Sequence, residues 1–366
     1  MRTHRPDYFF ISLVWILVGI GLACLLSASL IMGRNNFNDP YYYVKHQILF
    51  GGLIGLVGFL IMSKIYYRRL EKWAFPILII AIILMLLVFT PFGLEIKGAR
   101  RWVQIGPLPQ FQPSEFLKIA CVIYISAWLA NRISKMKKMT RGIIPLIIFL
   151  AIVCGLLVMQ KSTSTLLILF ISSIAILFLS GIKIRYLIFL CCAGVILVAA
   201  LAFIRPYILN RILSFVNQGN DIQGRDYQVN QSLIAIGSGG LGGVGFGNAV
   251  SKYNYLPEPM GDSIFAVVAQ EFGFVGSLIL VSLYFLFFVK GLNIARNSPD
   301  SFAKLLGAGL MIMIFFQTVI NIGAMTKLIP LTGQPLPFIS YGGTNLAVLL
   351  TSMGIIVNIS KHTRKV

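Results

Sequence analysis

The chain has 366 residues, of which 57% are hydrophobic and only 11% are charged, and its formal net charge is +20. Soluble globular domains carry about 25% charged residues, so this composition excludes that class and indicates an integral membrane protein. A strongly basic chain is also typical of nucleic-acid-binding proteins, and the positions of the basic residues decide between the two classes.

Ten apolar segments are long enough to cross a bilayer as helices, since the hydrocarbon core requires roughly 17–25 residues. We therefore expect an all-α integral membrane protein, a polytopic bundle of about ten transmembrane helices that forms a single domain over residues 1–366. In chain order the expected spans are residues 8–31, 44–62, 73–92, 113–130, 143–159, 163–180, 185–204, 263–289, 303–326 and 337–360.

Basic residues concentrate on one side of this arrangement. If the N-terminus is cytoplasmic, the segments on that side contain 19 of the 31 Lys and Arg residues but only three of the 11 Asp and Glu residues. The positive-inside rule accounts for this asymmetry and predicts a cytoplasmic-membrane protein with both termini in the cytoplasm and no nucleic-acid partner. The cysteines fall in expected spans without metal-ligand spacing, so we expect core residues; they are Cys24, Cys121, Cys154, Cys191 and Cys192.

One connection is unusually long. Residues 205–262, between the seventh and eighth expected spans, would lie on the outer side of the membrane, and long loops in compact proteins are usually functional. Tyr227–Ile236 is amphipathic enough for a short helix lying on the membrane surface. The glycine-rich run Gly237–Gly247 that follows is interpreted either as a turn-rich segment or as a loop whose backbone N–H groups bind phosphate.

Asp262 is the most informative single residue. It ends the long loop and directly precedes the expected span 263–289. A carboxylate at the membrane boundary is costly to desolvate, so it is retained either as a helix N-cap or as a functional group. These two interpretations remain open at the level of the residue itself.

Two further outer connections carry unusual residues. Arg100, Arg101 and Trp102 lie before the fourth span, and Glu115 and Lys118 follow in its first turns. Because Glu115 and Lys118 are three residues apart, they share a helix face and can pair, either as a structural ion pair or facing a polar cavity.

The connection before the last span contains two prolines and two glycines within Gln334–Gly343. This pattern predicts broken helix whose freed backbone groups are buried in protein or line a cavity. Ser340 would satisfy those groups or contact a polar ligand.

Four motifs on these outer segments resemble the signatures of the SEDS family (shape, elongation, division and sporulation), whose best-known members are FtsW and RodA. The resemblance runs from the first span to the last and is slightly closer to FtsW. The motifs are Gly98–Trp102 with Gln112–Lys118, Tyr227–Gln228 with Gln231–Ser232 and the glycine run, Leu256–Glu258 with Asp262–Ala266, and Pro335–Gly343.

The resemblance implies a peptidoglycan glycosyltransferase that polymerises lipid II into β-1,4-linked glycan strands on the outer face of the cytoplasmic membrane. It also implies a class B penicillin-binding protein as transpeptidase partner, together with other membrane proteins of cell division or elongation. The essential aspartate of the family matches Asp262, and its cavity-lining acid and lysine match Glu115 and Lys118.

The expected reaction joins a sugar hydroxyl to an anomeric carbon with inversion. A carboxylate can take the proton of the hydroxyl, and Asp262 is the candidate general base. Cations stabilise the departing pyrophosphate, and a divalent ion, Mg²⁺ or Mn²⁺, could share this role although no ligand cluster predicts one. The candidate substrate-binding residues are Glu115, Lys118, Arg100, Arg101, Trp102, Arg205, Arg211, Lys252 and Ser340.

The chain departs from the family pattern at two places. Lys161 and Ser162 occupy a loop where the family usually has an aspartate, and Met260 and Gly261 replace a common His-Thr pair before Asp262. The first departure puts in doubt any role carried over for that loop. The second removes a histidine-assisted proton path.

Two other functions are compatible with the sequence. A flippase or transporter would place ionisable residues near the membrane midplane and alternate its access, whereas the unusual residues here lie mainly on the outer side. A non-catalytic scaffold of the division or elongation machinery would tolerate Asp262→Asn.

Overall fold

The computed structural model describes residues 4–363 except residues 97, 108, 133–138, 205–208, 210–214, 216–225 and 254. Its helices are α1 Tyr8–Phe37, α2 Tyr42–His46, the π-helix η1 Gln47–Leu53, α3 Ile54–Lys64, α4 Arg68–Leu87, α5 Pro113–Arg132, α6 Met139–Met159, α7 Thr163–Leu179, α8 Ile184–Ile204, α10 Asp226–Ser238, the 3₁₀-helix η3 Val250–Lys252, α11 Ile264–Arg296, α12 Ser301–Met325 and α13 Gly343–Ser360. A hairpin of two antiparallel strands, β1 Gly93–Ile96 and β2 Ala99–Val103, completes the described elements.

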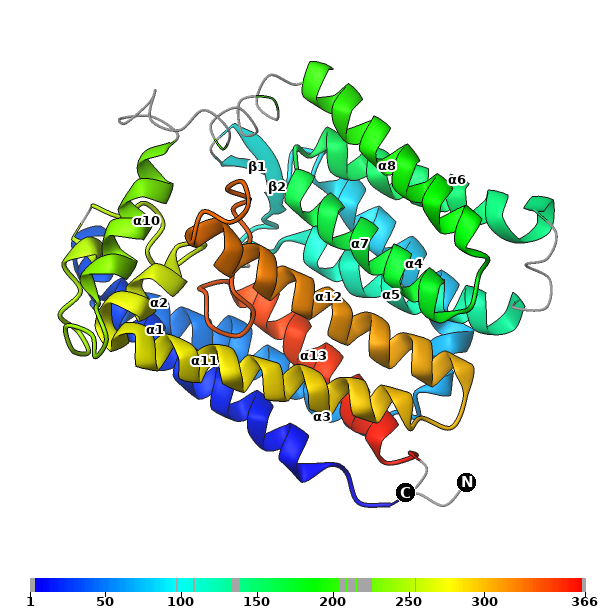
Figure 1. Cartoon of the computed structure of the whole chain (residues 1–366), viewed down its shortest axis with the longest axis horizontal. Helices are drawn as coiled ribbons and strands as arrows, with labels where there is room; N and C mark the ends of the chain where they lie inside the picture. The colour runs from blue at the N-terminus through cyan, green and yellow to red at the C-terminus, as the bar shows by residue number, and fades with distance from the viewer. Residues whose placement is uncertain are drawn as a thin grey trace.

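The expected membrane protein of about ten helices is confirmed, since each expected span coincides with an apolar helix. By length and composition, seven of these helices can cross a membrane, and the stretches Pro145–Met159, Thr163–Leu179 and Ile184–Ala200 are apolar but shorter. The second expected span is continuous through α2, η1 and α3. The described helices therefore form a polytopic bundle (Figure 1).

The expected start of the last span at residue 337 is wrong, because α13 begins at Gly343. Proline has no backbone N–H and breaks a helix interior, and Pro335 and Pro337 lie just before this point. The segment before α13 forms turns instead, and the side chain of Ser340 accepts a hydrogen bond from the N–H of Leu336 at 2.8 Å.

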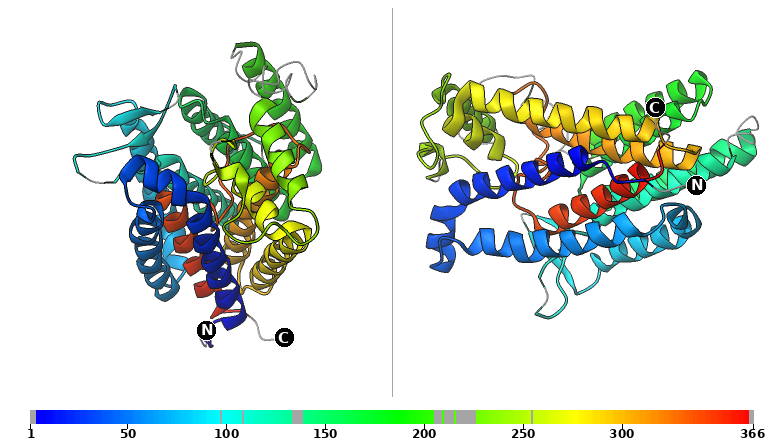
Figure 2. Two further views of the ribbon diagram at one scale, coloured as in Figure 1. Left: turned by 90° about the vertical axis from the view of Figure 1, so that its left-hand side faces the viewer. Right: turned by 90° about the horizontal axis from the view of Figure 1, so that it is seen from below.

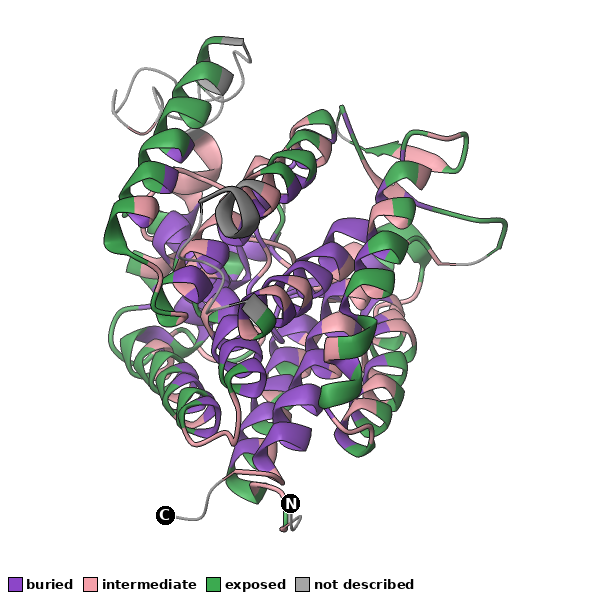
Figure 3. Cartoon of the chain, turned by 90° about the vertical axis from the view of Figure 1, so that its right-hand side faces the viewer, coloured by how far each residue is buried: buried purple, intermediate pink, exposed green. Residues whose placement is uncertain are grey.

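The most buried helices lie inside the bundle and the more exposed ones surround them. Most of α5, α12 and α13 is buried, whereas α4 and the part of α11 after Gly273 expose rows of large apolar side chains. Figure 3 shows this contrast between a buried interior and an exposed periphery. Exposed apolar helix faces of this kind are typical of contact with lipid. The interior is mainly apolar but also contains buried polar residues, among them Glu115, Lys118 and Gln317.

The two termini lie together at one end of the bundle. The N–H of His4 donates to the carbonyl oxygen of Lys361 at 3.0 Å, and the side chain of Ser360 accepts from the N–H of Asp7 at 3.1 Å. Helix α10 and the glycine-rich loop lie at the opposite end (Figures 1 and 2). This arrangement places the two described ends of the chain far from α10 and the glycine-rich loop.

The glycine-rich loop packs against a break in α11. Gly273 has φ +66° and interrupts the helix, so backbone groups near it lose their helical partners. Segments of the loop replace those partners: the N–H groups of Val244 and Gly245 donate to the carbonyls of Gln270 and Glu271, both at 3.0 Å. The loop carbonyls of Gly240 and Leu241 accept from Phe274 and Val275 at 2.9 and 3.1 Å.

These contacts explain why glycine is required in the loop. Gly243 has φ +81°, and a Cβ atom there would collide with the carbonyl oxygen of Glu271. Of the two interpretations of the glycine run, the structure supports the turn-rich segment, because the N–H groups of Val244 and Gly245 are occupied by α11. The predicted helix over Tyr227–Ile236 is confirmed as α10.

Candidate active site

Asp262 lies where the long loop enters α11. The cap position of that helix belongs to Ser263, so the interpretation of Asp262 as the N-cap is wrong. The carboxylate is half-buried, and its Oδ1 accepts a hydrogen bond from Nε2 of Gln228 at 3.0 Å. Gln228 belongs to α10 and also donates to Oγ of Ser263 at 3.0 Å, so the amide orients both side chains.

The backbone at Asp262 is fixed from a second direction. Nδ2 of Asn321, on α12, donates to the carbonyl of Asp262 at 2.8 Å and to the carbonyl of Gln334 at 2.7 Å. A Cβ atom at Gly333 would lie 3.5 Å from Oδ2 of Asp262, so the carboxylate also adjoins the connection before α13. Asp262 therefore lies at the junction of α10, α11, α12 and this connection.

Glu115 and Lys118 form the predicted ion pair on α5. The two charged atoms are 2.9 Å apart, and the side chains are only 3% and 2% exposed. Nζ of Lys118 also donates to Oε1 of Gln317 at 2.9 Å, and Nε2 of Gln317 donates to the carbonyl of Pro335 at 3.1 Å. Because Asn321 binds the neighbouring carbonyl of Gln334, hydrogen bonds connect the ion pair to the backbone of Asp262.

A cavity of about 920 Å³ lies beside this junction. Arg101 and Trp102 of the hairpin line it together with Glu258 and Gly261 of the long loop. Its other walls come from the second span, the segment around Tyr341 and the start of α13, and they include the apolar residues Phe50, Ile54, Ala347 and Val348. Asp262 itself is not among the lining residues, although Gly261, which precedes it, is.

Two lining residues were missed by sequence reasoning. Glu258 is exposed, lines the cavity and has φ +51°, a backbone conformation that costs free energy for a residue with a side chain. Its place in the Leu-Pro-Glu motif was a usable signal. His46 also lines the cavity, and its Nδ1 is hydrogen-bonded to the hydroxyl of Tyr341 at 3.0 Å. Burial raises the pKa of the Tyr341 hydroxyl above its usual value.

The two arginines of the hairpin differ in position. Arg100 pairs with Glu95 at 3.4 Å at the exposed surface and does not line the cavity. Arg101 lines the cavity, and its guanidinium donates to the carbonyls of Gln160 and Lys161. Nζ of Lys161 in turn donates to the carbonyl of Gly98 at 2.7 Å. The loop that departs from the family pattern is therefore attached to the hairpin.

Two other predicted substrate-binding residues, Lys252 and Ser340, are not among those that line the cavity. Lys252 is only 3% exposed and forms an ion pair with Glu271 at 3.2 Å rather than lining the cavity. The hydroxyl of Ser340 donates to the carbonyl of Gly261 at 2.6 Å. Of the two roles predicted for Ser340, this is the satisfaction of backbone groups. Arg205 and Arg211 lie outside the described residues.

Among the residues that the structure describes, no group of three or more His, Cys, Asp or Glu residues could hold a metal ion, and we assign no ligands to the predicted divalent cation.

Comparison with known proteins identifies the family. A family model described as "Cell cycle protein" and named for FtsW, RodA and SpoVE matches residues 8–365, and the chain belongs to this family, the SEDS proteins. The chain is 33% identical to stage V sporulation protein E of Bacillus subtilis, over 99% of both chains. It is 34% identical to a probable peptidoglycan glycosyltransferase FtsW of Trichlorobacter lovleyi, over 98% of this chain and 94% of the relative.

Solved structures agree with this assignment. The crystal structure of the rod shape determining protein RodA of Thermus thermophilus matches with a TM-score of 0.71 and 27% identity, covering 98% of both chains. A chain from a peptidoglycan synthase complex, described as coordinating polymerization and crosslinking, matches with a TM-score of 0.79 and 26% identity over 97% of both chains. The expected fold class is thus found in proteins of the same family.

Proposed function

We propose that the chain is a peptidoglycan glycosyltransferase that polymerises lipid II at the outer face of the cytoplasmic membrane. The observation that carries this proposal is the junction at Asp262. There, Gln228 donates a hydrogen bond to the carboxylate of Asp262. The preceding residue, Gly261, lines a cavity that combines a guanidinium with apolar walls. Such a cavity suits a substrate with both a charged head and a lipid tail, and the relatives named as glycosyltransferases support the same reaction.

In the proposed reaction Asp262 acts as general base. It takes the proton from the attacking sugar hydroxyl, which requires a heavy-atom separation of about 2.6–3.2 Å in the substrate complex. Gln228 donates a hydrogen bond to Oδ1 and so orients the carboxylate, whose Oδ2 lies on the side of Gly333. The new glycosidic bond forms as the bond to the pyrophosphate breaks, so a single displacement inverts the anomeric carbon.

The leaving pyrophosphate gains negative charge as its bond to the sugar breaks. Arg101 is the cavity cation proposed to stabilise it, because guanidinium groups bind phosphate oxygens through two parallel hydrogen bonds. Trp102 offers a ring against which a sugar can pack. Glu115 and Lys118 are proposed to support the site through Gln317 and the backbone at Pro335.

We further propose that both termini are cytoplasmic and that the site is extracytoplasmic. The charge asymmetry supports this orientation, as does the location of both termini at the end of the bundle opposite α10 (Figure 2). A class B penicillin-binding protein is the proposed partner, since a structural neighbour comes from a complex described as coordinating polymerization and crosslinking.

The direct test uses the purified full chain, with and without its penicillin-binding partner, supplied with fluorescent lipid II. The proposal predicts glycan strands from the wild type and none from Asp262→Ala. Movement of lipid II across vesicles without polymer would instead identify a flippase. Equal strand formation by the two chains would contradict the assignment of Asp262.

A further inference from the structure

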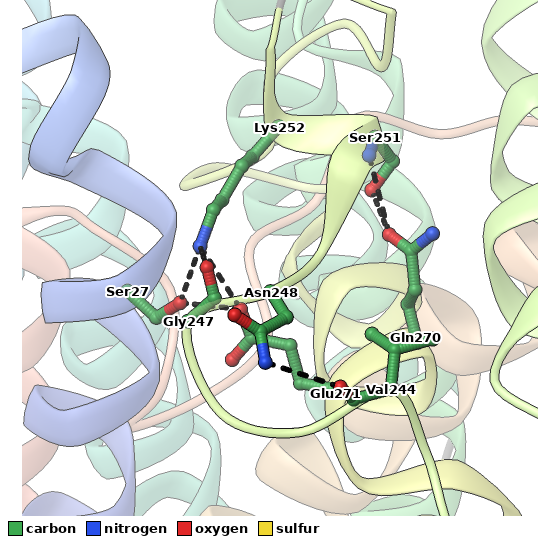
Figure 4. Close-up of polar contacts among 8 residues, drawn as sticks. All are labelled: Ser27, Val244, Gly247, Asn248, Ser251, Lys252, Gln270 and Glu271. Atoms are coloured by element: carbon green, nitrogen blue, oxygen red, sulfur yellow. Dashed lines mark hydrogen bonds and ion pairs between the residues drawn. The ribbon is translucent and has the colours of Figure 1, made fainter.

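A buried charged cluster lies behind the loop that carries Asp262. Nζ of Lys252 is 3.2 Å from Oε1 of Glu271, and both side chains are at most 3% exposed. The same ammonium donates to Oγ of Ser27 at 3.0 Å and to the carbonyl of Gly247 at 2.5 Å, and Ser27 also donates to Glu271. Figure 4 shows these side chains converging from α1, the loop and α11.

Ser251 and Gln270 form a second polar contact between the loop and α11. The N–H and hydroxyl of Ser251 both donate to Oε1 of Gln270, at 3.3 and 2.5 Å (Figure 4). Nε2 of Gln270 continues to Oγ of Ser238 at the end of α10 at 2.9 Å. Two consecutive loop residues, Ser251 and Lys252, therefore bind two consecutive residues of α11, just before the break at Gly273.

Apolar packing supplies little anchoring in this region. The buried cluster there consists mainly of small side chains, namely Ala28, Ala235, Ala249, Leu256, Ala266 and Val267. Hydrophobic stabilisation grows with the apolar area buried, so a cluster of alanines holds a loop weakly. Besides the ring contact of Phe246 with Phe272, the polar contacts of Ser251 and Lys252 attach the side chains of the loop to α11.

Backbone hydrogen bonds connect Ser251 to the segment that contains Asp262. The N–H of Leu256 donates to the carbonyl of Ser251 at 2.9 Å. Beyond Leu256, the N–H groups of Gly261 and Ser263 donate to the carbonyl of Glu258 at 3.0 and 3.3 Å, which folds the chain around Asp262. A displacement of Ser251 and Lys252 would therefore move the segment from Leu256 to Asp262.

A buried ion pair is weak evidence for stability, because replacing both charges with apolar groups is often neutral or stabilising. Its directional contacts can nevertheless fix one geometry. Resting on the proposed function, we infer that Lys252 and Glu271 are positioning residues: they hold the loop so that Asp262 and Glu258 lie correctly beside the cavity, and Lys252 does not touch the substrate.

The inference makes a kinetic prediction for Lys252→Met, measured with fluorescent lipid II and expressed per folded protein. A misplacement of about 1 Å in a catalytic group costs roughly 10²-fold in rate. We expect kcat to fall by about 10²-fold while KM for lipid II stays unchanged. Lys252→Arg, which keeps the positive charge, should recover most of the lost kcat.

The chain offers a matched control at the other end of the same two helices. Lys290 on α11 pairs with Asp7, the N-cap of α1, at 2.9 Å. Lys290→Met also removes an ion pair that joins these helices, but far from the loop, so kcat should remain that of the wild type. Hydrogen exchange at the amides of Gly261 and Ser263 should accelerate in Lys252→Met and not in Lys290→Met.

A second variant covers the case in which Lys252→Met does not fold, because that change leaves Glu271 buried without its cation. Lys252→Met combined with Glu271→Leu removes both charges, and we expect a folded protein with the same reduced kcat. Wild-type kcat in this double variant would overturn the inference, as would wild-type kcat in a folded Lys252→Met.

A raised KM with unchanged kcat in Lys252→Met would also overturn the inference, since it would mean direct contact with the substrate. Failure of the proposed function gives a different result, namely no strands from the wild type or full activity in Asp262→Ala. The two failures are therefore distinguishable in one set of assays.

Discussion

The ion pair of Glu115 and Lys118 permits a quantitative prediction for Lys118→Met. Both side chains are at most 3% exposed, and Nζ of Lys118 is 2.9 Å from the carboxylate and 2.9 Å from Oε1 of Gln317. The substitution leaves a buried carboxylate without its cation and an amide oxygen without its donor. Breaking a buried pair in this way costs about 3–5 kcal/mol, so we expect a loss of unfolding free energy in that range.

The double variant Lys118→Met with Glu115→Leu separates the pair from its surroundings. Removing both charges is often close to neutral, so the double variant should be more stable than Lys118→Met alone. Unfolding in mixed micelles, analysed as a double-mutant cycle, measures the coupling between the two residues.

An exposed ion pair of the same chain serves as the control for this experiment. Arg100 and Glu95 are 3.4 Å apart and more than half exposed, and such pairs contribute about 0–1 kcal/mol. Arg100→Met should therefore have little effect on stability. Additive losses from Lys118→Met and Glu115→Leu, with no coupling, would refute the reasoning about the buried pair.

Two further substitutions test the surroundings of Asp262. Gln228→Glu places a second carboxylate beside Oδ1 of Asp262 and should raise the pKa of Asp262. Because a general base must be ionised, the acidic limb of the profile of kcat/KM against pH should move to higher pH. An unmoved limb would contradict the contact. Gly243→Ala introduces a Cβ at φ +81° against the carbonyl of Glu271 and should destabilise the protein by more than about 1 kcal/mol. The control is Gly237→Ala on α10, whose new Cβ atom meets no other atom within 4 Å, so this variant should be neutral or more stable. Equal losses of unfolding free energy in the two variants would argue against the packing of the loop.

Hydropathy was sufficient to locate the spans because each apolar segment must be about as long as the hydrocarbon core. It did not reveal the break at Gly273, which lies inside a continuous apolar segment and depends on hydrogen bonds from the glycine-rich loop. The hairpin β1–β2 was also missed, since Gly93–Val103 contains adjacent arginines and little alternation.

The site was predictable where its residues are close in sequence. The pairing of Glu115 with Lys118 follows from their spacing on one helix. The contact of Gln228 with Asp262 joins α10 to the loop before α11 and depends on tertiary structure. Lys252 was predicted to bind pyrophosphate because it is a cation on the outer loop, and only the structure places it against Glu271. Charge type was therefore readable from sequence, but a charge's partner was readable only where the two residues lie close together in the chain.

The most direct test of the central claim compares the wild type with Asp262→Asn, a change that keeps the shape of the side chain and removes its basicity. Two quantities are measured on the same purified protein: the binding of lipid II and the single-turnover rate of glycosidic bond formation. General-base catalysis contributes about 10²–10⁴-fold, so the account predicts unchanged binding and a rate lowered by at least about 10²-fold. A wild-type rate in Asp262→Asn would contradict the account.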